Sequence, residues 1–311
     1  MINIDAEIYG EFTCKADKCK HSCCKGWEID IDEDTLEYYK DLDSELGNEI
    51  RQNIEWGEDS FFKLTPDERC PFLKDDGLCK IIEELGDDGL CDICRLHPRF
   101  FQVINDYNLA GVGLSCEKAT ELLFDKTSLD FIICDSGKKL SFVELLEMIE
   151  INIPQEELSL SDVISNYLQK DKEVAEIDAE IDTKIDAEID TKIEAIFDVF
   201  YETEAIDSNW KNEVLLIKKN YKENTQKCLN DLESSESLKK YDVIYQYIIF
   251  RQLELIETYG VTKIIEYAVQ SIIFIMLYAI FFGDDQEAVR RWSEQIEYNE
   301  DNIMIILERL N

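Results

Sequence analysis

The cysteines of this 311-residue chain are very unevenly distributed, and their positions limit what its amino-terminal part can form. Ten of the eleven lie within the first 134 residues, namely Cys14, Cys19, Cys23, Cys24, Cys70, Cys79, Cys91, Cys94, Cys116 and Cys134, whereas Cys228 lies far beyond them. An odd number of thiols cannot all pair within one chain, and crowded thiols without a secretion signal more often bind metal than form disulfides. The sequence therefore predicts a cysteine-rich metal- or cluster-binding domain at residues 1–135 and a second domain at residues 136–311.

Two of these thiols are expected at helix N-termini. A turn at Asp76-Gly77 precedes a short predicted helix at residues 80–85, closed by Gly86, and Ser115 is a plausible N-cap for a helix that ends near residue 124. Cys79 and Cys116 would then lie where the helix dipole lowers the pKa of a thiol and favours the thiolate that binds zinc or iron.

The identity of the metal stays open at this point. All-thiolate sets suit zinc or an iron–sulfur cluster, and the chain has more thiols than one zinc ion needs. The C-x-x-x-C-x-x-C triad of radical enzymes is missing. Cys19 and Cys23 have the spacing of its first two cysteines, but Gly26 stands at the position of the third. Some of the cysteines could be ordinary core residues, an interpretation that suits Cys134 and Cys228.

The order and spacing of several motifs resemble those of the flagellin lysine-N-methylases, within a wider group of cysteine-cluster, zinc- or iron-chelating proteins. The motifs are Cys23-Cys24-Lys25-Gly26-Trp27, Arg69-Cys70-Pro71-Phe72-Leu73, Gly77-Leu78-Cys79-Lys80-Ile81, Cys94-Arg95, Pro98-Arg99 and Leu114-Ser115-Cys116. The resemblance covers roughly residues 8 to 125.

This resemblance implies an S-adenosylmethionine-dependent protein lysine N-methyltransferase that acts on flagellin. It also implies an iron–sulfur cluster, of the four-iron type, with zinc as the alternative metal. The positions that match the family's cysteines are Cys14, Cys19, Cys23, Cys24, Cys70, Cys79, Cys94 and Cys116, and Cys91, Cys134 and Cys228 fall outside the pattern. A four-iron cluster takes four thiolates, so about half of the eight must do something else. One alternative function is a metal-binding or redox module, with zinc or an iron–sulfur cluster, that transfers no methyl group. Another is a structural zinc protein.

Other candidate groups give weaker signals. His97 could be a base or a ligand, but the following Pro98 favours an extended turn residue, and His21 is a less favoured ligand. Gly111-Val112-Gly113 resembles a phosphate-binding loop, although an isolated G-x-G is weak evidence. A β-hairpin that turns near Asn105-Asp106 explains this region better.

The balance of charges narrows the partners. The chain has 69 acidic and 32 basic residues, a formal charge of −37, which argues against nucleic acid and against anionic membranes as partners. The same charge suits a lysine-bearing partner, or simply keeps the protein soluble.

The start of the chain shows no secretory signal, and the apolar stretch at residues 272–282 is too short to span a membrane. We therefore expect a cytoplasmic protein with a buried core helix at that stretch.

The remaining sequence predicts helices. Only 4 Pro and 12 Gly occur, and helical periodicity is visible at residues 141–170, 241–259, 263–282, 285–296 and 301–310, with Gly260 and Gly283 as breaks. An eight-residue repeat at 177–184 recurs identically at 185–192, so the low-complexity segment at 176–194 is expected to be a repeat-expanded helix or a mobile insert. The expected fold is mainly α: a cysteine-rich amino-terminal domain with short helices and a β-hairpin, followed by a helical bundle.

Overall fold

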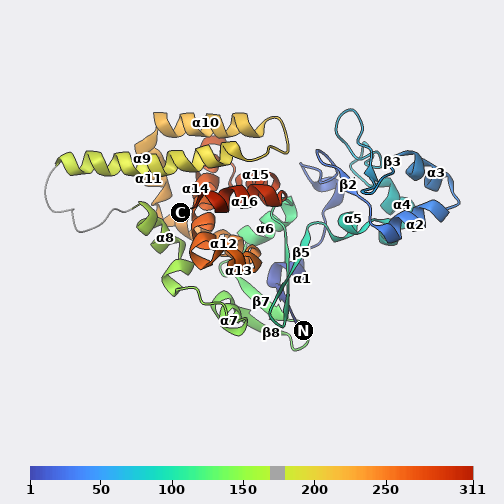
Figure 1. Ribbon diagram of the computed structural model, residues 1–311, viewed down its shortest axis with the longest axis horizontal. Helices are drawn as coiled ribbons and strands as arrows, with labels where there is room; N and C mark the ends of the chain where they lie inside the picture. The colour runs from blue at the N-terminus through green and yellow to red at the C-terminus, as the bar shows by residue number, and fades with distance from the viewer. Residues whose placement is uncertain (169–178, 311) are drawn as a thin grey trace.

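A five-stranded sheet forms the middle of the molecule. The computed structural model describes residues 1–168 and 179–310 (Figure 1). The sheet has the order β5-β6-β1-β7-β8, in which β1 pairs parallel with β6 and the other neighbours are antiparallel. Its strands are β1 (Ile2–Ala6), β5 (Arg99–Ile104), β6 (Tyr107–Val112), β7 (Asp130–Ile133) and β8 (Lys138–Ser141). The β5–β6 hairpin turns at Asn105, which has a positive φ of 52°, so the hairpin expected there is present.

Helices make up most of the carboxyl-terminal half, which confirms the mainly α prediction. They are α8 (Leu160–Leu168), α9 (Ala179–Glu202), α10 (Trp210–Glu223), α11 (Thr225–Leu232), α12 (Ser235–Arg251), α13 (Ile256–Tyr259), α14 (Val261–Phe282), α15 (Asp285–Ile296) and α16 (Glu300–Arg309). Gly260 and Gly283 flank α14, both at positive φ, as the sequence suggested. The side chain of Asp284 caps α15 by accepting from the backbone N–H of Glu287.

The apolar helix α14 lies in the centre of this half. Among the described residues it is the one helix long and apolar enough to cross a membrane, but 78% of its most apolar window is buried inside the protein. Ile272, Phe274 and Ile275 are fully buried. The stretch is therefore a core helix, as predicted, and the cytoplasmic location stays a prediction.

The segment expected to be helical from 141 to 170 is only partly so. Strand β8 runs to Ser141, which caps α7 (Phe142–Met148) through a capping box with Glu144, and irregular chain leads to α8. The low-complexity repeat continues into α9, where Ile193 is buried, whereas residues 176–178 lie outside the described part.

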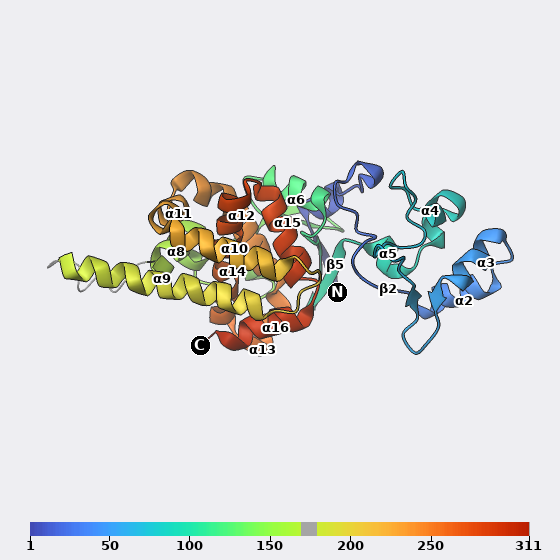
Figure 2. The ribbon, with the colours of Figure 1, turned by 90° about the horizontal axis from the view of Figure 1, so that it is seen from above.

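Residues 13–98, between α1 (Glu7–Glu11) and β5, form a small lobe that stands apart from the helical mass (Figures 1 and 2). It contains α2 (Glu33–Asp41), α3 (Glu45–Gln52), α4 (Lys80–Leu85), α5 (Asp92–Leu96) and three short strands, β2 (Ile29–Asp30), β3 (Ile54–Glu55) and β4 (Phe61–Phe62). Its own hydrophobic core is built around Tyr39, Phe62 and Phe72.

The buried clusters divide the chain differently from the boundary that we expected at residues 135/136. That boundary falls in the turn between β7 and β8, two paired strands of one sheet. One core runs from Ile4 to Leu310 and joins the sheet to the helices, and the second belongs to the small lobe. The division into domains at residues 1–135 and 136–311 stays a prediction.

Candidate metal centre

Cys79 and Cys116 lie at helix N-termini, as expected. Cys79 is the N-cap of α4, which ends at Gly86, and Cys116 rather than Ser115 is the N-cap of α6 (Glu117–Phe124). The expected fall in thiol pKa is wrong for both residues. Burial raises the pKa of each thiol and outweighs the backbone N–H groups that favour the thiolate.

The backbone of the small lobe brings Cys24, Cys70 and Cys79 together. The N–H of Cys70 donates to the carbonyl of Cys24 over 2.9 Å, and Lys25 forms an isolated bridge with Arg69. The chain then turns, and the backbone of Leu73 forms an isolated antiparallel β-bridge with that of Cys79. Two sequence groups that are far apart along the chain, one with Cys24 and one with Cys70 and Cys79, thus meet next to the lobe's aromatic core.

Cys91 and Cys94 complete this group, which we call the inner set (Cys24, Cys70, Cys79, Cys91 and Cys94). All five pack in or against the small lobe's core. The thiol of Cys70 interacts electrostatically with those of Cys24, Cys79 and Cys91, and burial raises its pKa to about 12. Cys94 donates a hydrogen bond to Cys91, which lowers the pKa of Cys91, and its further thiol partners are Cys24 and Cys70.

A second group, the outer set (Cys14, Cys19, Cys23 and Cys116), lies where the small lobe meets α6. Lys15 pairs with Glu117 at 2.9 Å and also with Glu121, and the backbone N–H of His21 donates to Glu117 over 2.5 Å. These contacts hold the loop at residues 14–21 against the start of α6, beside Cys116.

The thiols of the outer set interact with one another. Burial first, and then Glu117, Cys116 and Cys14, raise the pKa of Cys19 to about 11. Cys23 and Cys116 each interact electrostatically with Cys14, and Cys23 interacts with Cys116 as well. His21, the weaker ligand candidate, is exposed and lies 3.4 Å from Glu287 of α15.

The adjacent pair Cys23-Cys24 connects the two sets. The thiol of Cys23 donates to Cys24, which lowers the pKa of Cys24 to about 7 and raises that of Cys23. The hydrogen bond from Cys23 thus favours the thiolate form of Cys24, which is the form that binds metals. The two residues lie in a turn, and the thiol of Cys23 also interacts electrostatically with those of Cys116 and Cys14.

The donors suit a thiolate-bound metal by their chemistry, because thiolates are preferred ligands of zinc and of iron–sulfur clusters. Sets of four or more thiols are what zinc and four-iron clusters require. Within residues 1–168 and 179–310, however, no group of three or more His, Cys, Asp or Glu side chains has the close arrangement of metal ligands. We therefore derive no reaction step through a metal.

The cysteines outside the family pattern behave differently from one another. Cys228 is a buried core residue, as expected, but the core interpretation of Cys134 is wrong, because its side chain is exposed just after β7. Cys91 was left out of the ligand set and is part of the inner set. Its C-x-x-C spacing with Cys94 was the sequence signal for it.

His97 lies at the end of α5. It is extended, as the following Pro98 predicted, and the His97–Pro98 bond is cis. Its ring lies 6.4 Å from that of Trp27 and 5.8 Å from that of Tyr298, which extends the contacts to the end of α15. Its Nε2 atom is buried and lacks a hydrogen-bond partner in the described structure.

The pKa of His97 decides its chemical role. Burial, reinforced by the charge of Arg251, lowers this pKa to about 4, so the imidazole is neutral at physiological pH. A general base works best with a pKa near the working pH. His97 is therefore a weak proton acceptor, and its neutral ring is better suited to packing and hydrogen bonding.

A buried ion pair lies next to His97. Arg251, the last residue of α12, has its Nε atom 3.0 Å from Oε1 of Glu297, whose side chain is fully buried. The guanidinium also lies over the ring of Phe100, 4.5 Å from its centre. Sequence reasoning missed this pair, because its partners are 46 positions apart on separate helices and neither belongs to a motif.

Both glycines of Gly111-Val112-Gly113 are explained by packing. A Cβ atom at Gly111 would lie 2.5 Å from the ring of Phe100. At Gly113 it would lie 2.8 Å from the hydroxyl of Tyr298. The strand needs glycine at these positions to approach the helices, without any phosphate-binding role.

We expect stability to fall as the pH is lowered from about 6.5 to about 4. The folded pKa of His97 lies below its unfolded value, so the unfolded chain binds the extra proton in this range and folding weakens. Urea unfolding at pH 7 and pH 5 measures the effect for the wild type and His97→Gln. The variant should lose less stability than the wild type between the two pH values, and equal losses would contradict the assignment.

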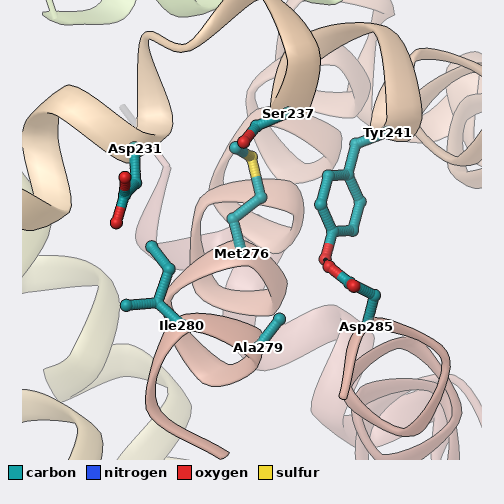
Figure 3. Close-up of a pocket in the computed structure, with 7 residues that line it drawn as sticks. All are labelled: Asp231, Ser237, Tyr241, Met276, Ala279, Ile280 and Asp285. Carbon is teal, nitrogen blue, oxygen red and sulfur yellow. Dashed lines mark hydrogen bonds between the residues drawn. The ribbon is translucent and has the colours of Figure 1, made fainter. Parts of the chain in front are cut away.

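The helical half also contains a small surface pocket of about 120 Å³, shown in Figure 3. It is lined by Asp231, Ser237, Tyr241, Met276, Ala279, Ile280 and Asp285, and the hydroxyl of Tyr241 donates to Asp285 over 2.5 Å. Ligand pockets usually measure about 300–1,000 Å³. This one is too small for a nucleoside cofactor, and it contains no cysteine.

Three curated proteins were found to be similar to the chain. It is 27% identical over 123 residues, 37% of its length, to the flagellar biosynthetic protein FliU of Salmonella muenchen, of which the match covers 72%. The same identity and length relate it to the lysine-N-methylases of Salmonella typhimurium and Salmonella choleraesuis, but there the match spans only 30% of the relatives' length. No family model matches the chain. No solved structure matches it either.

The chain is thus similar to two proteins named lysine-N-methylase and to a flagellar biosynthetic protein, in agreement with the resemblance that the motifs indicated. The shared region is limited to little more than a third of this chain.

Proposed function

We propose that the protein is an S-adenosylmethionine-dependent protein lysine N-methyltransferase that acts on flagellin, with an iron–sulfur cluster held by its amino-terminal cysteines. The observation that carries this proposal is the similarity to two proteins named lysine-N-methylase and to a flagellar biosynthetic protein. The ordered cysteine motifs of residues 14–116, which gather into two sets of thiols, support the cluster part of the proposal.

The reaction is a direct substitution at the methyl carbon of a sulfonium. The lone pair of the lysine ε-nitrogen forms the new C–N bond, and the electrons of the breaking C–S bond go to sulfur, which gives S-adenosylhomocysteine. The nitrogen must be unprotonated when it attacks, so one proton passes to solvent or to a base. The charge of −37 favours the approach of a lysine-bearing partner by long-range attraction, an effect that salt screens.

The cluster would be held by four of the eight cysteines that match the family pattern. When bound, a four-iron cluster supplies one-electron chemistry or a rigid cross-link between distant segments of the chain. Zinc would supply only the cross-link, since it has no redox chemistry. A brown protein with broad absorption near roughly 400 nm indicates iron–sulfur, and a colourless zinc-containing protein indicates the alternative metal.

The second candidate function is a metal-binding or redox module without methyl transfer. It is favoured by the limited extent of the similarity, because the match spans only 30% of the lysine-N-methylases, and most of their length therefore has no counterpart in the alignment. The two candidates differ in one property that is simple to measure, the affinity for S-adenosylmethionine.

Calorimetric titration of the full-length, anaerobically purified protein with S-adenosylmethionine separates them. A methyltransferase should bind this donor and S-adenosylhomocysteine with dissociation constants on the order of micromolar to millimolar, the usual range of substrate affinities. Adenosine is the control ligand, and it should bind at least tenfold more weakly. A folded, metal-containing protein that binds neither sulfur compound would overturn the methyltransferase proposal and favour the second function.

A further inference from the structure

We infer that the loop at residues 14–21, which we call the docking loop, holds the small lobe against the helices through ion pairs, and that the lobe changes position when these pairs are broken by salt. This inference goes beyond the proposed function, and it holds whether or not the protein binds a metal or transfers methyl groups. Cys14 and Cys19 belong to the docking loop and Cys116 to the start of α6, so the same movement would change the distance between these thiols.

Apolar packing does not fix the position of the lobe. The lobe is joined to the rest of the protein where the chain leaves α1 after Glu11 and where it enters β5 at Arg99. Among the described residues, the two hydrophobic cores and the apolar side chains packed against them have no member in common. Parts of a chain that share no apolar core usually move relative to one another. The contacts between the lobe and the helices therefore decide how the lobe is held.

Lys15 makes one of these contacts, with two carboxylates of α6. Its Nζ atom lies 2.9 Å from Oε2 of Glu117, and it also pairs with Glu121, about one turn further along the helix. The side chains of Lys15 and Glu117 are only 20% and 11% exposed, so water screens this pair less than a fully exposed one. The backbone N–H of His21 donates to the other oxygen of Glu117 over 2.5 Å. The docking loop thus occupies both oxygens of this carboxylate.

The imidazole of His21 reaches a second helix. Its Nε2 atom lies 3.4 Å from Oε2 of Glu287 in α15. The same oxygen accepts a hydrogen bond from Nε of Arg290 over 2.8 Å, and the side chain of Arg290 is only 6% exposed. Glu287 is therefore held in place by a nearly buried guanidinium. Both α6 and α15 contribute to the main core, so the docking loop is attached to two helices of one packed unit.

The charges of the loop and of the surface that receives it are complementary. Residues 14–25 contain four lysines and one aspartate, in a chain that has 69 acidic and 32 basic residues. The groups that receive the docking loop are the carboxylates of Glu117, Glu121 and Glu287. Salt weakens such attraction, because the Debye length falls from about 10 Å at 0.1 M to about 3 Å at 1 M ionic strength. High salt should therefore release the docking loop.

A distance measurement between the lobe and the helices tests the inference. Dyes for resonance energy transfer are attached to azide-bearing amino acids placed at two exposed positions, Asp41 of α2 and Asn212 of α10, so that the cysteines stay unlabelled. The full-length, anaerobically purified protein is measured at 0.1 M and at 1 M potassium chloride.

Three variants are compared with the wild type. Lys15→Met/His21→Gln changes the docking loop, and Glu117→Gln changes the helix that receives it. Lys74→Met is the matched control, because Lys74 also pairs with two carboxylates, Asp76 at 2.7 Å and Glu83 at 3.0 Å, but within the lobe. Helical circular dichroism shows that each variant is folded.

The wild type and Lys74→Met should show a single transfer efficiency at 0.1 M salt and a lower, broader distribution at 1 M. Lys15→Met/His21→Gln and Glu117→Gln should show the low and broad distribution already at 0.1 M, with little further change at 1 M. The two loop-contact variants should agree, since they remove the same ion pair from opposite sides.

Two results would overturn the inference. Equal efficiencies in all four proteins at both salt concentrations would show that other contacts fix the lobe. A salt response of the same size in the wild type and in the two loop-contact variants would show that other charges hold it. Neither result bears on methyl transfer, which is measured separately.

Discussion

Replacing Arg251 by methionine should lower the free energy of unfolding by about 3–5 kcal/mol, one of the largest effects that we expect from a single substitution. The guanidinium is the ion-pair partner of Glu297, whose side chain is fully buried. Methionine keeps much of the side-chain volume but removes the charge. The carboxylate would remain buried with Ser293 as its hydrogen-bond donor, and burial already raises the pKa of Glu297.

Equilibrium urea unfolding, followed by helical circular dichroism, measures the loss. The control is Arg309→Met, because the ion pair of Arg309 with Glu202 is exposed and should contribute about 0–1 kcal/mol. The double variant Arg251→Met/Glu297→Met should recover much of the lost stability, since replacing both charges by apolar groups is often close to neutral. A loss of less than about 1 kcal/mol in Arg251→Met would show that the pair contributes little.

Phe274→Ala should destabilise the helical half by about 3–5 kcal/mol, the usual cost of removing a buried aromatic ring. Phe274 is fully buried in α14 and stacks on Phe200 of α9, with ring centres 4.4 Å apart and an angle of 2° between the planes. It also contacts Trp210 of α10. The ring therefore joins three helices, and its removal leaves a cavity at the point where they meet.

Phe282→Ala is the matched control for this prediction. It removes the same side chain from the same helix, but Phe282 is 43% exposed. Its loss should cost less than about 1 kcal/mol, because little apolar surface is buried there. Similar losses for the two variants in the same urea titration would mean that the core is not centred on α14.

The carboxyl-terminal helices could be predicted because their signals are local. The helix predicted at 285–296 corresponds to α15, and Gly260 and Gly283 mark the ends of α14. Helical periodicity and glycine breaks act within a few residues, so sequence alone reveals them. The same holds for the helix at 80–85 and for the hairpin around Asn105.

The sheet could not be predicted in this way. Strand β1 pairs parallel with β6, more than 100 positions away, and strand β8 ends at Ser141, the first residue of the segment predicted to be helical. Such pairings depend on packing between distant segments, for which a short strand carries no local signal. The boundary expected at residues 135/136 lies inside the β7–β8 hairpin.

The candidate site was predicted in composition but not in arrangement. Sequence motifs identified the cysteines, but the assignment of Cys23 to one set and Cys24 to the other depends on the fold around two adjacent residues. The expected lowering of the Cys79 thiol pKa was wrong. Burial, which the sequence does not reveal, raises this pKa by more than the helix N-terminus lowers it. The C-x-x-C spacing of Cys91 with Cys94 was a sequence signal, and the packing of the lobe places Cys91 in its core.

Methyl transfer itself is the most direct test of the proposed function. Full-length, metal-reconstituted protein is incubated anaerobically with flagellin and S-adenosylmethionine that carries a deuterated methyl group, and the peptides are analysed by mass spectrometry. The account predicts deuterated methyl groups on lysine ε-nitrogens, an equal amount of S-adenosylhomocysteine, and no transfer to flagellin whose lysines were acetylated beforehand. Unmodified lysines in the presence of folded, metal-loaded protein would contradict it.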